Sequence, residues 1–221
     1  MTTRTLDRPG TARTLAATAA AVGVAAASVY PRARRWGRTF GATPAEVAAT
    51  LEGDSLLPDA HAVATRAVDI AAPPSDVWPW VAQLGQGRAG FYSYDVLETL
   101  AGCDIRSADR VEPAWQDVQV GDPFPLHPEF ALEVALVDPP RALVALGKAP
   151  SAEEATVPYD FSWAFVLRPG AVGTRLLVRE RYVYLTRSAP ALVEGFSWVS
   201  LLMTERMLRG IRDRAEVAPA P

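Results

Sequence analysis

The sequence is poor in the residues that bind metal ions and attack substrates. It contains one cysteine, Cys103, and two histidines, His61 and His127, which are far apart in the chain. A single cysteine forms no disulfide within the chain, and there is no cysteine cluster for zinc or an iron–sulfur centre. Metal hydrolases, Cys–His proteases and Ser–His–Asp hydrolases are therefore poor fits, and we predict neither a metal ion nor a cofactor.

An excess of positive charge is also missing. The 25 acidic residues outnumber the 22 basic ones, which gives a net charge of −3, and Lys148 is the only lysine. Such a chain has no broad positive field, so we expect no nucleic-acid partner. With 221 residues, of which 49% are hydrophobic, the chain is long enough to fold around one core without disulfides.

The N-terminal part contains an uncharged run, residues 14–31, between two groups of arginines. Its length approaches the roughly 20 residues that cross a bilayer, but it consists mainly of alanine, which inserts less readily than leucine. Three alternatives remain: a membrane anchor with the following domain in the cytoplasm, a cleaved secretory signal, or a segment that stays in water. We divide the chain into a tail (1–35), a connector (36–59) and a main domain (60–216).

Local signals predict the elements of the first half of the chain. Thr43 and Glu46 have the spacing of a capping box, which predicts a short helix near 44–51. A strand at 62–71 is then followed by two short helices, and we expect a further short strand within 103–113.

The second half of the chain has clearer patterns. Apolar side chains occupy every second position of 159–167, and again of 176–184 after a turn containing Pro169, with Glu180 as the exception. This alternation is typical of two strands of a hairpin, each with one face turned to the core. From about residue 190 to 216, apolar residues recur at helical spacing and predict one long amphipathic helix. They are Leu192, Phe196, Val199, Met203, Met207 and Ile211.

The segment IAAPPSDVWPWVAQLG at the end of the first strand resembles the opening of SRPBCC (START-like, polyketide cyclase/dehydratase-like) proteins. The stretch GQGRAGFYSYDVLETLAGCD and the final MLRGIRDRAE resemble a subgroup whose activity is uncertain. The resemblance covers about residues 60–215. It implies an α+β helix-grip fold: a seven-stranded antiparallel sheet wrapped around a long C-terminal helix, with two short helices after the first strand. Members of the family hold lipids, sterols, polyketides or hormones in a cavity, or catalyse cyclisation and dehydration there.

The glycines of GQGRAG match the dinucleotide fingerprint GxGxxG, but they follow a helix rather than a strand. Out of that context the motif is weak, so we expect a tight connection between two helices. Loops above a rigid scaffold often carry binding contacts. The side chains beside this loop could therefore form the lip of a cavity; they are Arg88, Phe91, Tyr92 and Tyr94.

Glu180 is the most distinctive candidate. Strand alternation places its carboxylate on the same face as Val178 and Tyr182, which should point inward. Burying an unpaired charge is costly, so a functional carboxylate here would bind a ligand or take part in catalysis. The structural alternatives are a salt bridge to Arg206 or Arg209 on the helix, and a bulge that turns the side chain to water. The catalytic candidates are Glu180, Tyr182 and Tyr184.

Aromatic and methionine side chains complete the predicted site. Phe161, Trp163 and Phe165 on the strand, and Met203 and Met207 on the helix, either pack the core or line a pocket for an apolar ligand. We therefore expect a domain that binds a small hydrophobic or amphipathic molecule between sheet and helix. The alternatives are a cyclase or dehydratase that uses acid–base residues of the cavity, and an interaction module without a ligand. The sequence specifies neither the ligand nor the oligomeric state.

Overall fold

The computed structural model describes residues 28–217, except 101 and 104. The chain divides into two compact units, Met1–Trp36 and Gly37–Pro221. Of the uncharged run at 14–31, residues 14–27 lie outside the described part, and residues 28–31 belong to a helix at 28–38. Within the described residues, no helix combines the length and the apolar character needed to span a bilayer. The membrane anchor stays a prediction.

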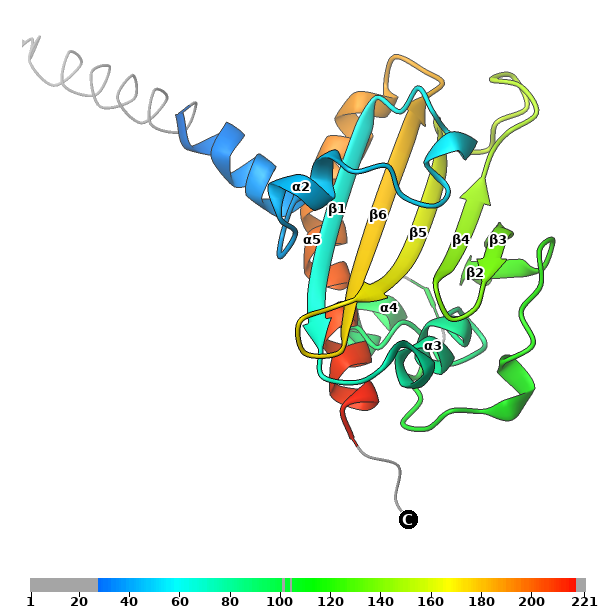
Figure 1. Cartoon of the computed structure of the whole chain (residues 1–221). Helices are drawn as coiled ribbons and strands as arrows, with labels where there is room; N and C mark the ends of the chain where they lie inside the picture. The colour runs from blue at the N-terminus through cyan, green and yellow to red at the C-terminus, as the bar shows by residue number, and fades with distance from the viewer. Residues whose placement is uncertain (1–27, 101, 104, 218–221) are drawn as a thin grey trace, which may run out of the picture. The chain divides into compact units, whose positions relative to one another are not determined.

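The second unit is built on one antiparallel sheet (Figure 1). Its strands follow the order β1-β6-β5-β4-β3-β2. The bounds are β1 Ala62–Ile70, β2 Pro123–His127, β3 Phe130–Asp138, β4 Ala142–Gly147, β5 Tyr159–Pro169 and β6 Thr174–Tyr184. β2 contains two prolines and lies at the edge, where a missing N–H donor breaks no ladder. The predicted hairpin is β5–β6, the longest strand pair.

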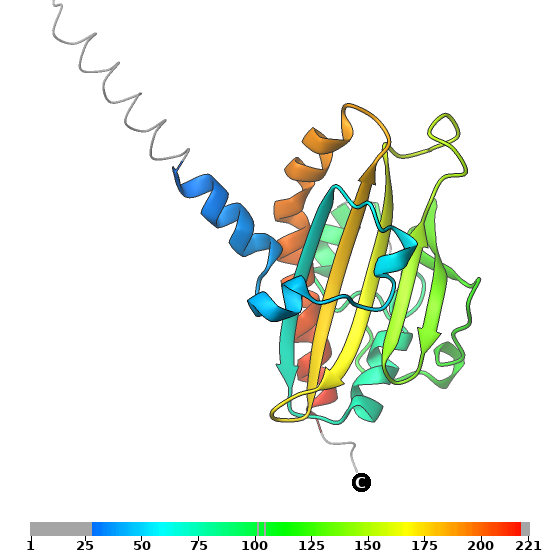
Figure 2. The same ribbon diagram turned by 45° about the horizontal axis from the view of Figure 1, so that its top comes forward.

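Helices flank this sheet. The α-helices are α2 Pro44–Ala48, α3 Pro74–Ala82, α4 Asp95–Leu100 and α5 Ala189–Ala215, with short 3-10 turns at Asp54–Leu56 and Pro113–Trp115. Strand, two short helices, further strands and a long final helix are the order of the α+β helix-grip fold, as predicted. Figure 2 shows α5 lying along one face of the sheet while the chain around α2 crosses the other.

The predicted strand count is wrong by one: six strands, not seven, are present in the part of the chain that the structure describes. In the described residues of 103–113, which are all but 104, the expected strand does not form. Two of its backbone N–H groups bind other segments instead: Ser107 donates to the carboxylate of Asp95, the first residue of α4, and Ala108 donates to the carbonyl of Ala89 in the loop before α4. Ile105 is buried in the core. The segment therefore packs as an irregular loop.

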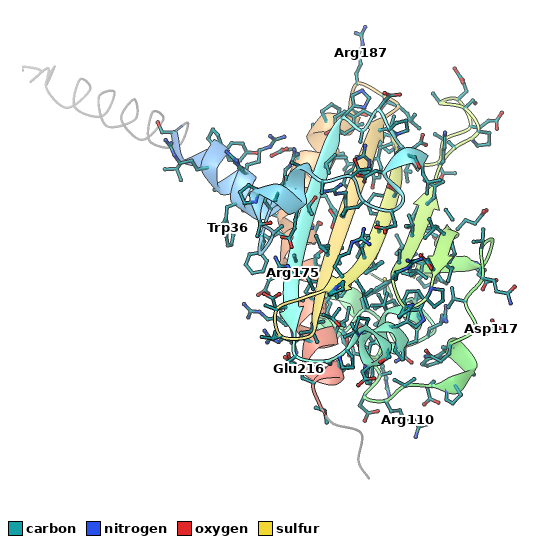
Figure 3. All side chains as sticks on the ribbon, viewed as in Figure 1. Trp36, Arg110, Asp117, Arg175, Arg187 and Glu216 are labelled. Atoms are coloured by element: carbon teal, nitrogen blue, oxygen red, sulfur yellow. The ribbon has the colours of Figure 1, made fainter. Side chains whose placement is uncertain are left out.

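The connector covers the outer face of the sheet. α2 begins with the predicted capping box, in which Thr43 and Glu46 bind each other's backbone N–H groups, although it ends earlier than expected. Three arginines at alternate positions of β6 hold this segment. Arg175, labelled in Figure 3, binds the Glu46 carboxylate and lowers its pKa to about 2. Arg179 binds Asp54, and Arg181 binds the carbonyl of Leu57.

The inner face of the sheet carries the main core and packs against the C-terminal half of α5. Met207, Leu208 and Ile211 are almost fully buried there. Gly210 allows close contact, because a Cβ at this position would lie 2.4 Å from the carbonyl oxygen of Tyr92. The predicted apolar stripe is only partly buried, since Leu192 in the N-terminal half is 51% exposed.

Candidate ligand-binding cavity

A cavity of about 810 Å³ lies between the inner face of the sheet and α5. Its walls are mainly apolar. Buried lining residues include Phe91, Cys103, Ile105, Thr204 and Met207. The part of α5 that borders the cavity runs from Phe196 to Met207.

Exposed side chains mark the rim of the cavity. On α5 they are Phe196, Val199 and Leu202, which are 57%, 46% and 45% exposed. Opposite them lies the loop between β4 and β5, which contributes the exposed Lys148 and Glu154. An apolar rim that continues into an apolar interior gives a hydrophobic molecule a way in.

The structure brings most of the predicted site residues to this cavity. The predicted residues that line it are Phe91, Phe161, Trp163, Glu180, Tyr182, Met203 and Met207. Phe165 lies outside it and is fully buried against Phe124 and Trp163. Tyr184 also lies outside it, with its ring stacked on His61 at 5.0 Å.

The other predicted lip residues have structural roles. Arg88 donates hydrogen bonds to the carbonyls of Ala82 and Trp115. Tyr92 is buried in a left-handed conformation (φ 54°), and its hydroxyl donates to the carbonyl of Trp80. Burial raises the pKa of Tyr92. Tyr94 is 36% exposed and does not line the cavity.

The GxGxxG segment forms the expected tight connection between α3 and α4. Gly85, Gly87 and Gly90 all have positive φ, and Gly85 and Gly90 form a β-bridge. A Cβ on Gly90 would lie 2.7 Å from the side chain of Ile105. Glycine is needed here for backbone conformation and close packing.

Glu180 points inward, as predicted, and is 5% exposed. Its carboxylate accepts a hydrogen bond from Arg66 at 2.7 Å, and that ion pair is buried. It also accepts bonds from Ser200 at 2.7 Å and 2.9 Å, from Thr204 at 3.2 Å and from the Tyr182 hydroxyl at 3.2 Å. The charge is thus compensated by one cation and three hydroxyl groups.

The expected helix partners of Glu180 are wrong. Arg206 lies near Asp213, and Arg209 pairs with Glu205 one turn away on α5. No bulge turns Glu180 outward, because the pairing of β6 with β1 and β5 continues through it. The cation that pairs with Glu180 is Arg66, which the sequence analysis does not predict. The sequence does contain a sign of this pairing, since Arg66 is the single charged residue among the alternate positions of β1 that face the core.

Three further polar groups of the cavity wall come from the β5–β6 hairpin. Burial, followed by the charge of Glu180, raises the pKa of Tyr182 well above its ordinary value. Burial also raises the pKa of Tyr159, so both phenols are protonated at neutral pH. The indole Nε1 of Trp163 is buried and has no acceptor among the described residues. The wall therefore offers neutral hydrogen-bond donors.

No cluster of metal-binding side chains occurs within residues 28–217 as described. The cavity wall combines apolar area with the phenols of Tyr159 and Tyr182, the indole of Trp163 and the Glu180 carboxylate, whose charge Arg66 balances. Such a set can orient an apolar molecule by a few polar contacts.

Comparison with known proteins gives distant matches. No protein-family model and no curated protein matches the chain. Similar solved structures include a protein of Mycobacterium smegmatis (15% identity, 72% of this chain and 93% of that one, TM-score 0.43). Another is a protein of Mesorhizobium loti (13%, 72% and 100%, TM-score 0.41). A third is a Polyketide_cyc-like protein of Corynebacterium glutamicum (16%, 70% and 91%, TM-score 0.34). The polyketide cyclase-like type that the sequence resembles is thus found among the similar structures, while the cavity rests on this chain's own geometry.

Proposed function

We propose that this domain binds a small hydrophobic or amphipathic molecule, lipid-like or polyketide-like, in the cavity between the sheet and α5. The observation that carries the proposal is the cavity of about 810 Å³. Protein interiors are normally close-packed with few voids larger than a water molecule, whereas ligand pockets range from about 300 to 1,000 Å³. A hollow of this size is thus large enough for a ligand.

The chemistry of the walls supports an apolar ligand. Aromatic rings of Phe91, Phe161 and Trp163 face the interior from one side, and Met203 and Met207 face it from α5. Methionine side chains adapt to ligands of irregular shape. An interaction module with a filled core has no need of such a hollow.

Native mass spectrometry of the purified full chain tests this proposal. We expect a co-purified small molecule, or uptake of the neutral fluorescent probe N-phenylnaphthylamine. Met203→Trp should fill the cavity and remove most of the probe binding. Val172→Trp, at a position 61% exposed in the β5–β6 turn, should leave it unchanged. Probe binding that is equal in both variants, or absent from the native chain, would contradict the proposal.

An acid–base enzyme is the second candidate, because the Tyr182 hydroxyl lies 3.2 Å from the Glu180 carboxylate in the cavity wall. The surroundings of the pair favour binding over catalysis. Both oxygens of Glu180 already accept hydrogen bonds, and the raised pKa of Tyr182 keeps its phenol protonated, so neither group is a free base. Recovery of a bound ligand with unchanged mass supports a carrier. Loss of water from the ligand that stops in Glu180→Gln would support a dehydratase.

A further inference from the structure

Four polar side chains of the cavity wall form one patch on the β5–β6 hairpin. In the strand register Trp163 lies opposite Glu180, and Phe161 lies opposite Tyr182. The rings of Tyr159 and Tyr182 are in edge contact, with centroids 5.4 Å apart. All four polar side chains, Tyr159, Trp163, Glu180 and Tyr182, line the cavity. One part of the cavity wall therefore groups two phenols, an indole and a carboxylate.

The ion pair within this patch has no charge to offer a ligand. Arg66 is 1% exposed and does not line the cavity, so it lies behind Glu180. Its guanidinium already bonds Glu180, Ser200 and the carbonyl of Gly37. Arg66 and Glu180 together carry no net charge. A carboxylate or an ammonium group placed beside them would be buried without a counter-charge, which is costly.

Neutral donors remain available beside the pair. Within the described part of the chain, the hydroxyl of Tyr159 makes no hydrogen bond, and the Nε1 of Trp163 has no acceptor. The Tyr182 hydroxyl is held only by the 3.2 Å bond to Glu180. A ligand oxygen can accept a hydrogen bond from Tyr159, and a ligand hydroxyl can donate one to the oxygen of Tyr182, whose own hydrogen is bound to Glu180.

We infer that the cavity selects a neutral apolar molecule bearing a hydroxyl or carbonyl oxygen, and that the phenols of Tyr159 and Tyr182 bind this oxygen. This inference rests on the proposed function and adds the class of ligand. Long-chain acids and amines are disfavoured because their charge would be desolvated. An acid has one other way to bind, with its tail inside and its carboxylate at the rim near the exposed Lys148.

Displacement of N-phenylnaphthylamine by decanol, decanoate and decylamine at neutral pH tests the inference, because the three competitors share one chain length. Decanol should bind at least about ten-fold more tightly than either ion, given the cost of burying charge. Tyr159→Phe and Tyr182→Phe should each weaken decanol binding by about three- to ten-fold, the effect of one neutral hydrogen bond. Both variants should keep the affinity for the probe, which has no oxygen.

Tyr184→Phe is the matched control. It removes the same atom from the same face of β6, but Tyr184 lies outside the cavity, so decanol binding should not change. Thermal unfolding of each variant checks that it is folded.

Equal affinities for the three competitors, or undiminished decanol binding in both cavity variants, would overturn the inference and leave the proposed function intact. The same holds if decanoate binds best and Lys148→Met abolishes its binding. If neither the probe nor any competitor binds, the proposed function fails as well.

Discussion

The two halves of α5 differ both in sequence and in surroundings: residues 189–202 contain one charged residue, Glu194, whereas residues 203–215 contain six. In the C-terminal half, Met207, Leu208 and Ile211 are at most 1% exposed. In the N-terminal half, Phe196 and Leu202 are 57% and 45% exposed. Gly210 lets the C-terminal half approach the backbone of Tyr92, whereas nothing lies within 4 Å of a Cβ at Gly195.

This difference explains how one helix both stabilises the domain and leaves room for a ligand. Tight packing at one end fixes the helix on the core, while the other end carries the exposed apolar side chains that border the cavity. The Arg66–Glu180 pair lies at the transition, where Ser200 and Thr204 of α5 bind it. Substitutions along α5 should therefore separate stability from binding.

The largest effect on stability is expected at the buried ion pair, which lies where the two halves of α5 meet. Arg66→Met removes the counter-charge of the buried Glu180 and should lower the free energy of unfolding by about 3–5 kcal/mol. The double variant Arg66→Met/Glu180→Leu should recover much of that loss, because neither charge then remains buried. Urea denaturation measures both. A single variant that loses less than about 1 kcal/mol, the usual worth of an exposed pair, would show that the pair is solvated.

A matched pair of leucines compares the halves directly. Leu208→Ala, at a position 1% exposed, should lower the free energy of unfolding by about 2–5 kcal/mol and hardly change probe binding. Leu202→Ala, at the rim, should lower stability by less than about 1 kcal/mol and weaken probe binding. Equal losses in the free energy of unfolding of the two variants, measured by chemical denaturation, would contradict the difference between the two halves.

Substitutions of two glycines, one in each half of α5, should have the next largest effect on stability. Gly210→Ala places a methyl group against the backbone of Tyr92 and should lower stability by about 1–3 kcal/mol. Gly195→Ala meets open space and should raise stability by about 0.5–1 kcal/mol, since alanine favours the helix. The shifts in melting temperature should thus have opposite signs; shifts of the same sign would contradict the difference in packing.

The smallest effect belongs to the opposite face of the sheet, which α2 covers. Arg175 holds the pKa of Glu46 at about 2, below the ordinary 4.5. The pair therefore stabilises the fold above about pH 4.5, and its contribution disappears as pH falls towards 2. Melting temperatures of the native chain and Glu46→Gln should differ at neutral pH and converge near pH 2. A constant difference would mean that Glu46 acts by another route.

The sequence predicts the elements that depend on local patterns. Alternation in 159–184 specifies the hairpin, and Thr43 with Glu46 specifies the start of α2. The strand expected within 103–113 is wrong because the backbone of Ser107 and Ala108 binds Asp95 of α4 and Ala89 rather than another strand. The apolar stripe of α5 indicates which face turns inward, but not how closely a sheet approaches it. The partner of Glu180 could not be found by helical spacing, because Arg66 is 114 residues away along the chain.

The arginines of β6 determine how far the domain can be truncated from its N-terminal side and still fold. Arg179 is 2% exposed and binds the carbonyls of Glu46, Val47 and Ala49. A truncated protein starting at residue 60 would leave this guanidinium, and the apolar patch around Leu177 and Val166, without their cover. The smallest autonomous folding unit is therefore expected to begin near Gly37 and to aggregate when shortened further.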